Sequence, residues 1–182
     1  MKDVYIPQIL TFWFSEIEPK QWFTKSDAFD QSLTEKFGPL VADALGGRLD
    51  GWAKDKDGSL ALILLLDQMT RNIHRGTPLS FAGDEMALAI ALRAIDKGFL
   101  EDGKGPRNLF MLMPLMHSED ISIHHKALPL FTEHAPEMSL KSLGEHTAII
   151  ARFGHYPHRN EILGRPSTDE EIAFLKEPGS SF

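Results

Sequence analysis

The 182-residue sequence contains no cysteine. This absence excludes disulfide bonds, a thiolate nucleophile and any metal site built on cysteine. Long apolar runs are also lacking: the longest, residues 60–66 and 109–116, fall far short of the ~20 residues that cross a bilayer. The first ten residues include Asp3 and have no extended apolar stretch, which argues against a secretory signal. We therefore predict a cytoplasmic protein with no membrane partner.

An excess of positive charge is lacking as well. The chain carries 19 Lys and Arg against 26 Asp and Glu, for a net charge of −7. Nucleic acids and anionic membranes are bound through basic surfaces, so neither partner is expected, and any anion site must be local. The hydrophobic share of 42% is ordinary for a globular protein. We predict one domain over residues 1–182, with residues 177–182 as a short tail, and a homo-oligomer is compatible with these numbers.

Alternating β-branched segments joined by hairpin turns, the pattern typical of strands, are absent. Apolar residues instead recur every three or four positions, as they do on amphipathic helices. The predicted fold is all-α, a single domain of about eight packed antiparallel helices. Their expected ranges are 7–15, 27–45, 59–73, 84–97, 106–116, 118–133, 139–153 and 168–176. Thr168 with Glu171 has the spacing of a capping box, and Ser118 and Ser139 are expected as helix caps.

The sequence also lacks the common catalytic fingerprints. It has no Gly-x-Ser-x-Gly elbow, no phosphate-binding loop, no dinucleotide-binding glycine motif and no His-Glu-x-x-His zinc motif. We predict no cofactor and no metal. Four aromatic residues near the N-terminus, Trp13, Phe14, Trp22 and Phe23, have a spacing that favours a place in the core over a docking surface.

Arginine, by contrast, is concentrated. Five of the eight arginines lie in segments 67–78 and 152–165, which contain no lysine: Arg71, Arg75, Arg152, Arg159 and Arg165. The planar guanidinium suits bidentate contacts with carboxylates or phosphates and partly buried ion pairs, whereas lysine prefers solvent. We therefore expect these two segments to supply the two halves of one arginine-rich site.

In the first segment, Asp67, Arg71 and Arg75 follow one another at four-residue spacing, so they share one side of a helix. One interpretation is that Arg71 pairs with Asp67 while Arg75 stabilises the helix end. The other is that the helix presents cationic groups at the rim of a pocket. The sequence leaves both open.

A second polar cluster is PLMHSED, residues 114–120. Ser118 as a helix cap followed by two acids is a routine helix start, which leaves His117 to orient a carboxylate, act as a base or simply pack. We expect PLMHSED to be the acidic counterpart of the arginine segments. His124, His125 and His134 lie among polar helix positions and are expected on the surface.

The third cluster is RFGHYPHRN, residues 152–160. His155 and His158 are three residues apart, but Pro157 between them argues against one continuous helix that carries both. The metal signal is therefore weak, although His117, Glu119, Asp120 and His146 would be candidate ligands.

Several motifs of this sequence resemble those of a known family. WF at residues 13–14 and 22–23, LALILLLDQMTRNIHRGTP, FAGDEMALA, PLMHSED and RFGHYPHRNEILGRPSTDEE, in this order, resemble the bacterial family called domain of unknown function 924. The resemblance implies an all-helical fold with tetratricopeptide-like helix pairs and implies no particular reaction. The chain departs from the family pattern at Met69-Thr70, His74 and His155-Tyr156, which argues against a shared role for His74 or His155. The family's polar motif positions correspond here to Asp67, Gln68, Arg71, Asn72, Arg75, His117, Ser118, Glu119, His146, Arg152, Phe153, Gly154, Pro157, His158, Arg159, Asn160, Gly164 and Arg165.

Three functional hypotheses remain. The first is a pocket for a small anionic ligand or a peptide carboxylate. The second is a hydrolase-like enzyme with His117 or His158 as base, Glu119 or Asp120 as the orienting acid and arginines that stabilise negative charge. The third is a purely structural network of buried ion pairs with a role in protein–protein interaction. The candidate ligand-binding residues are Asp67, Arg71, Asn72, Arg75, His117, Glu119, Arg152, His158, Arg159 and Asn160.

Overall fold

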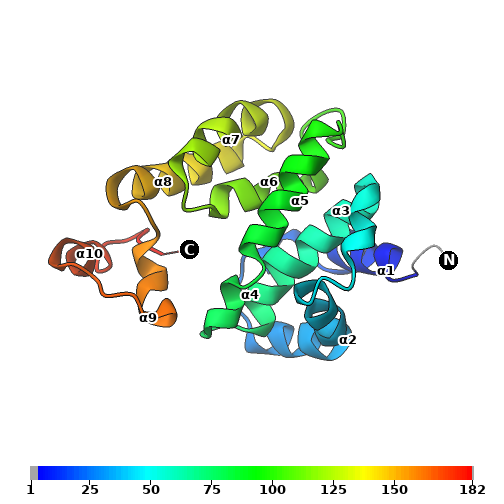
Figure 1. The fold of residues 1–182 in the computed structure, drawn as a ribbon, viewed down its shortest axis with the longest axis horizontal. Coiled ribbons are helices and arrows are strands. Elements are labelled where there is room, and N and C mark those ends of the chain that lie inside the picture. The colour runs from blue at the N-terminus through cyan, green and yellow to red at the C-terminus, as the bar shows by residue number, and fades with distance from the viewer. Residues whose placement is uncertain (1–3, 182) are drawn as a thin grey trace.

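The computed structural model describes residues 4–181, and every regular element in that range is helical (Figure 1). The α-helices are α1 (Tyr5–Thr11), α2 (Asp27–Leu45), α3 (Lys56–Ile63), α4 (Thr70–Ile73), α5 (Asp84–Asp96), α6 (Pro106–His117), α7 (Ile121–His134), α8 (Met138–Phe153), α9 (Asn160–Leu163) and α10 (Asp169–Phe174). Two π-helical turns, Phe12–Glu16 and Leu64–Met69, and four 3₁₀ turns, Pro19–Trp22, Asp50–Lys54, Pro78–Phe81 and Pro157–Arg159, lie between them. The prediction of an all-α fold is confirmed.

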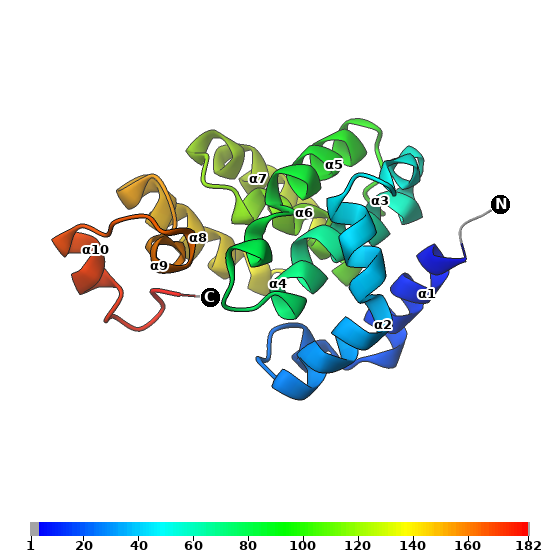
Figure 2. The same cartoon turned by 60° about the horizontal axis from the view of Figure 1, so that its bottom comes forward.

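Helix α6 lies at the centre of the fold because it is apolar on all sides. Residues 108–116 are all buried, and α6 contacts α3, α5, α7 and α8 (Figures 1 and 2). One hydrophobic cluster extends from Ile9 in α1 to Leu143 in α8. A smaller cluster, Ile149, Ile150 and Tyr156, lies beneath the C-terminal segment. Helices α9 and α10 occupy the end of the molecule far from α1 (Figure 1).

Several helix boundaries differ from the expected ranges. The segment predicted as one helix over 59–73 is divided into α3, the π turn and α4. The prediction that Ser118 caps α7 is wrong, because the carboxylate of Asp120 accepts a hydrogen bond from Ser122 N at 2.8 Å and starts the helix at Ile121. The cap predicted at Ser139 is also wrong: that residue lies inside α8, whose N-cap is Glu137. The Thr168 capping box is confirmed.

The N-terminal aromatic residues cluster around Phe110 of α6. Trp13, which is 0% exposed, meets Phe110 edge-on at 5.5 Å between ring centroids. The ring of Trp22 does the same at 5.1 Å. Phe23 stacks on Phe110 but remains 65% exposed, so the core prediction is wrong for this ring. It covers the cluster from outside.

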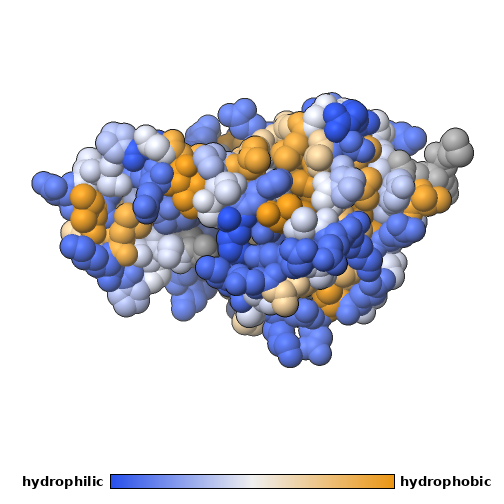
Figure 3. All heavy atoms as spheres, turned by 90° about the horizontal axis from the view of Figure 1, so that it is seen from below, coloured by the Kyte–Doolittle hydropathy of each residue, from blue (hydrophilic) through white to orange (hydrophobic). Residues whose placement is uncertain are grey.

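The surface offers no broad apolar face in the view of Figure 3, where hydrophobic side chains form separate patches among hydrophilic ones. Among residues 4–181, no helix is both long and apolar enough to cross a bilayer. At the C-terminus, residues 177–181 form no helix, and Ser180 is buried, with its hydroxyl donating to Leu175 O at 3.1 Å. The last residue of the predicted tail, Phe182, lies outside the described residues.

Candidate functional site

The π-helical turn Leu64–Met69 places a carboxylate in the interior of the protein. A π turn is wider than an α-helical turn and is often found at functional sites. The hydroxyl of Thr70 donates to Leu65 O at 2.7 Å, and the same carbonyl also accepts the backbone N–H of Thr70. Every residue of the turn is buried, and Asp67 is 0% exposed. The side-chain amide of Gln68 donates to Asp67 Oδ2.

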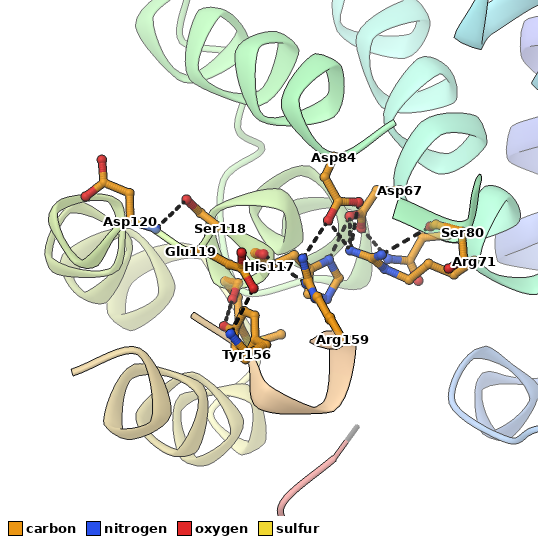
Figure 4. A network of polar contacts seen from close by, with 12 residues as sticks. Asp67, Arg71, Ser80, Asp84, His117, Ser118, Glu119, Asp120, Tyr156 and Arg159 are labelled. Carbon is orange, nitrogen blue, oxygen red and sulfur yellow. Dashed lines mark hydrogen bonds and ion pairs between the residues drawn. The ribbon is translucent and has the colours of Figure 1, made fainter. Parts of the chain in front are cut away.

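Gly83 lets the start of α5 lie directly on this turn. A Cβ atom at Gly83 would be 2.2 Å from Leu66 O, a distance that no side chain allows. The close approach sets the position of the next residue, Asp84, whose carboxylate lies beside Asp67 and Arg71 (Figure 4). Helix α5 therefore supplies the second carboxylate of the site.

Two arginines, one from each arginine-rich segment, meet at Asp84. Arg71 Nη2 lies 3.0 Å from Asp84 Oδ1 and also contacts Asp67 Oδ1 at 3.3 Å. From the other side, Arg159 Nη1 donates to Asp84 Oδ2 at 3.0 Å. These four side chains are called the inner network below. Their two negative and two positive charges cancel.

Backbone and ring contacts hold both guanidinium groups of the inner network. Arg71 Nη1 donates to Ser80 O at 3.3 Å, and Arg159 Nη2 donates to the carbonyl of His117 at 3.0 Å. The guanidinium of Arg159 also contacts the faces of the Phe81 and Tyr156 rings, at 4.6 Å and 4.7 Å from their centroids. Such cation–π contacts are strongest where water is excluded, and the Arg159 side chain is only 8% exposed.

Asp67 also orients His117. Nδ1 of His117 lies 2.7 Å from Asp67 Oδ1. Burial alone would raise the pKa of Asp67, but the contacts with His117 and Arg71 outweigh it and hold that pKa well below its ordinary value. An ionised carboxylate can only accept a hydrogen bond, so we assign the ring proton of His117 to Nδ1. No described residue hydrogen-bonds to Nε2, which is left as an acceptor in the neutral ring.

The inner network forms part of the floor of a surface groove of about 540 Å³. The groove runs between the start of α5, the junction of α6 and α7, and the turn that carries Arg159 (Figure 4). His117 lines it, and this side chain is 13% exposed. Nε2 of His117 is therefore the atom that a bound molecule would meet. The full lining is Pro78, Phe81, Ala82, Asp84, Glu85, Leu88, Pro114, His117, Ser118, Glu119, Asp120, Arg159 and Leu163.

Behind the groove, buried histidines surround Tyr156. Burial lowers the pKa of His146 to about 3. Burial and the neighbouring Arg159 lower the pKa of His158 to about 4. Tyr156 anchors the segment to α6 by donating its hydroxyl proton to Met116 O at 2.5 Å. These imidazoles are neutral at pH 7 and add no positive charge to the site.

His124 belongs to the same region, and the expectation that it lies on the surface is wrong. It is 1% exposed because it sits on the face of α7 that packs against α8. Its Nδ1 lies 3.0 Å from Thr147 Oγ1 and its Nε2 lies 2.8 Å from Ser118 O. The histidine thereby fixes the chain just after His117.

Comparison with known proteins identifies the family. The sequence model of one family, described as "Bacterial protein of unknown function (DUF924)", matches residues 9–179. The chain belongs to this family. A solved structure of a protein of unknown function from Agrobacterium tumefaciens is similar in fold, with a TM-score of 0.88 and 37% sequence identity over 94% of this chain and 97% of that one. No curated protein matches the chain.

The family motifs do not all meet at the groove. Arg75 Nε and Asn72 Nδ2 both contact the carboxylate of Asp30 in α2, at 2.6 Å and 2.8 Å. Arg152 pairs with Glu170 at 2.8 Å on the surface. These contacts, called the outer pairs below, lie outside the groove lining.

Two further motif positions hold the C-terminal segment in place. Glu119 accepts a bidentate contact from Arg165, at 2.7 Å and 3.0 Å, and a hydrogen bond from Tyr156 N at 2.8 Å. Burial would raise the pKa of Glu119, but these hydrogen bonds lower it below the ordinary value. Asn160 Nδ2 donates to Ser167 Oγ at 3.1 Å. Glu119 lines the groove with both of its oxygens already bound.

Sequence reasoning missed two residues of the site, Asp84 and Tyr156. Asp84 reads as an ordinary acid in a first helical turn, and Tyr156 as one aromatic among several. The motif FAGDEMALA contained a usable signal, because a glycine immediately before a helix start can report a close backbone approach. Among the described residues, no group of three or more His, Asp or Glu side chains is arranged to hold a metal ion.

Proposed function

We propose that the chain is a binding protein and that the groove at His117 is its ligand site. The observation that carries this proposal is the environment of one imidazole: Nδ1 is held by a fully buried carboxylate, while Nε2 opens on a groove of about 540 Å³. Burying a carboxylate costs free energy. Carboxylates that fix the tautomer of a histidine are common where that histidine contacts a ligand.

The arginines contribute to this site mainly as a frame. An anionic ligand or peptide carboxylate, the ligand expected from the arginine-rich segments, would need a guanidinium that is free to bind it. Arg71, Arg75, Arg152 and Arg159 each contact a carboxylate of the chain instead. Of these four, only Arg159 lines the groove. His117 is therefore the stronger candidate for the first contact with a ligand. The cytoplasmic location and the tetratricopeptide-like pairing remain predictions.

The test uses three six-carbon probes, n-hexylamine, 1-hexanol and hexanoate, which fit the apolar walls and differ in the head group. Each is titrated into ¹⁵N-labelled protein at pH 7, and histidine side-chain and backbone amide resonances are followed by NMR. We expect at least one probe to shift the resonances of His117 and of its groove neighbours, Asp84 and Leu88.

The critical variant is His117→Asn. Its side-chain amide can still donate to Asp67 but has no counterpart of Nε2, so we expect the fold to persist and the probe shifts to disappear. His125→Asn, on the exposed face of α7, is the matched control and should bind like the parent. If no probe shifts His117, or if His117→Asn responds as strongly as the parent, the proposal is wrong.

The Asp67–His117 pair also favours a second candidate, in which His117 accepts a proton from a bound water or hydroxyl group. A carboxylate that orients a histidine is the arrangement of a general base. Of the candidate catalytic residues, His117 combines a carboxylate partner with a place in the groove, whereas Glu119 is bound by Arg165, and His158 is absent from the groove lining. Hydrolysis of p-nitrophenyl hexanoate that is lost in His117→Asn and kept in His125→Asn would support this activity, and equal rates in both variants would exclude it for this ester.

A further inference from the structure

The head group of the ligand can be deduced from the groove, and this deduction rests on the proposed function above. In the tautomer that the contact with Asp67 selects, Nδ1 of His117 carries the proton and Nε2 presents a lone pair. A bound molecule satisfies this lone pair by donating an N–H or O–H. A carboxylate has no proton to donate at neutral pH, so it would need a second proton on the imidazole.

The fixed charges near His117 are already compensated by one another. The inner network is already neutral, and its Arg159 lies close enough to His117 to bind its carbonyl. Among the other groups around this ring, His146 has its ring centroid 6.3 Å away and a pKa lowered to about 3. His158, the next imidazole along, has a pKa lowered to about 4. Glu119, the acid nearest in sequence, is neutralised by Arg165. A bound anion would thus meet no uncompensated positive charge.

Negative charge, in contrast, is left over at the rim of the groove. Glu85 and Asp120 are both exposed and line the groove, and neither forms an ion pair with any described residue. Asp120 lies at one end of the row of polar side chains in Figure 4, and Arg71 lies at the other. The walls between are apolar and include Phe81, Leu88 and Leu163. A cationic head on an aliphatic stem matches this arrangement of charges and walls.

We infer that the groove binds a small alkylamine, with the protonated amine donating to Nε2 of His117 and lying in the field of Glu85 and Asp120. The methylene groups of the ligand would cover Phe81 and Leu88. One ammonium has three N–H donors, so it can meet the imidazole and still face a rim carboxylate. Arg159 then serves as a positioning residue, since it holds Asp84 and the His117 carbonyl in place without touching the amine.

The three probes test this inference by the order of their affinities. We expect n-hexylamine to bind at least tenfold more tightly than hexanoate, with 1-hexanol between them. Glu85→Gln and Asp120→Asn should each weaken hexylamine binding about twofold to fivefold, as expected for exposed charges, and leave hexanol binding unchanged. Asn is a good helix cap, so Asp120→Asn keeps the start of α7. Glu133→Gln, on an exposed position of α7 outside the groove lining, is the control.

The outcomes separate this inference from the function on which it rests. If hexanoate binds more tightly than hexylamine at His117, or if hexanol binds as tightly as hexylamine, the amine inference is wrong while the groove remains a ligand site. If the rim variants bind hexylamine as the parent does, the role of Glu85 and Asp120 is wrong. If none of the three probes shifts His117, the inference and the proposed function fail together.

Discussion

The inner network and the outer pairs draw their arginines from the same two segments, yet they differ in how many ionic partners each group has, and the pair Arg152–Glu170 also differs in burial. In the inner network, Asp84 binds two arginines, and Asp67 at 0% exposure binds both Arg71 and His117. In the outer pair Arg152–Glu170, each side chain has a single ionic partner and is about half exposed or more. Buried charges are expensive to leave unpaired, whereas exposed pairs are screened by water. The difference teaches that the position of an arginine, and not its presence, determines what it does.

The largest expected effect is that of Asp67→Asn. This change keeps the size of the side chain but leaves the buried network with one uncompensated positive charge, so we expect a loss of about 3–5 kcal/mol in the free energy of unfolding. Glu170→Gln, the matched change in the exposed outer pair, should lose less than about 1 kcal/mol. Urea denaturation at pH 7 measures both. Equal losses in the two variants would remove the distinction between inner and outer contacts.

The next effect tests how α5 is positioned over the π turn. Gly83→Ala introduces a methyl group that would approach Leu66 O to 2.2 Å, so α5 must shift, and we expect a loss of about 1–3 kcal/mol. Gly51→Ala is the control, because its added methyl group meets no atom within 4 Å. Thermal unfolding compares them, and Asp84 side-chain contacts should be disturbed only in Gly83→Ala. A Gly83→Ala protein as stable as the control would contradict the close approach.

Acidification should act on the interior before it acts on the outer pairs. The pKa of His158 is lowered from 6.5 to about 4 in the folded protein, so the unfolded chain binds more protons than the folded one between these values. Stability therefore falls as the pH falls from 6.5 towards 4, by up to about 1.4 kcal/mol per pH unit for such a histidine. His158→Gln should reduce that slope, as measured by urea denaturation at pH 6.0 and 5.0. An unchanged slope would show that His158 is not held in its neutral form.

The smallest effect is expected at the surface. Arg152→Gln breaks the contact with Glu170, and we expect less than about 1 kcal/mol of destabilisation, diminishing further at high salt. Probe binding at His117 should be unchanged, since Arg152 is outside the groove lining. A loss of binding in this variant would place Arg152 in the site and contradict the distinction between the inner network and the outer pairs.

The helices could be predicted from periodicity, whereas the geometry of the site could not. The bounds of α2, Asp27–Leu45, coincide with the predicted range, because Ser26 caps it and Gly46 follows it. The π turn escapes prediction because an apolar run such as residues 60–66 has the same pattern in either kind of helix. The partner of His117 is 50 residues away in the sequence, whereas the sequence suggested Glu119 or Asp120 as the orienting acid. Arginine content identified the segments that meet at Asp84. In the folded protein, however, Arg75 binds Asp30 and Arg152 binds Glu170, so neither contributes to the groove.

The most direct test of the account is the protonation state of the His117 imidazole, measured at pH 7 from the ¹⁵N shifts and long-range ¹H–¹⁵N couplings of the ring. The account predicts a neutral ring with the proton on Nδ1, an unprotonated Nε2 that shifts when hexylamine is added, and loss of this tautomer preference in Asp67→Asn. A ring protonated on Nε2, or on both nitrogens, would contradict the claim that Nε2 of His117 is an acceptor that faces the groove.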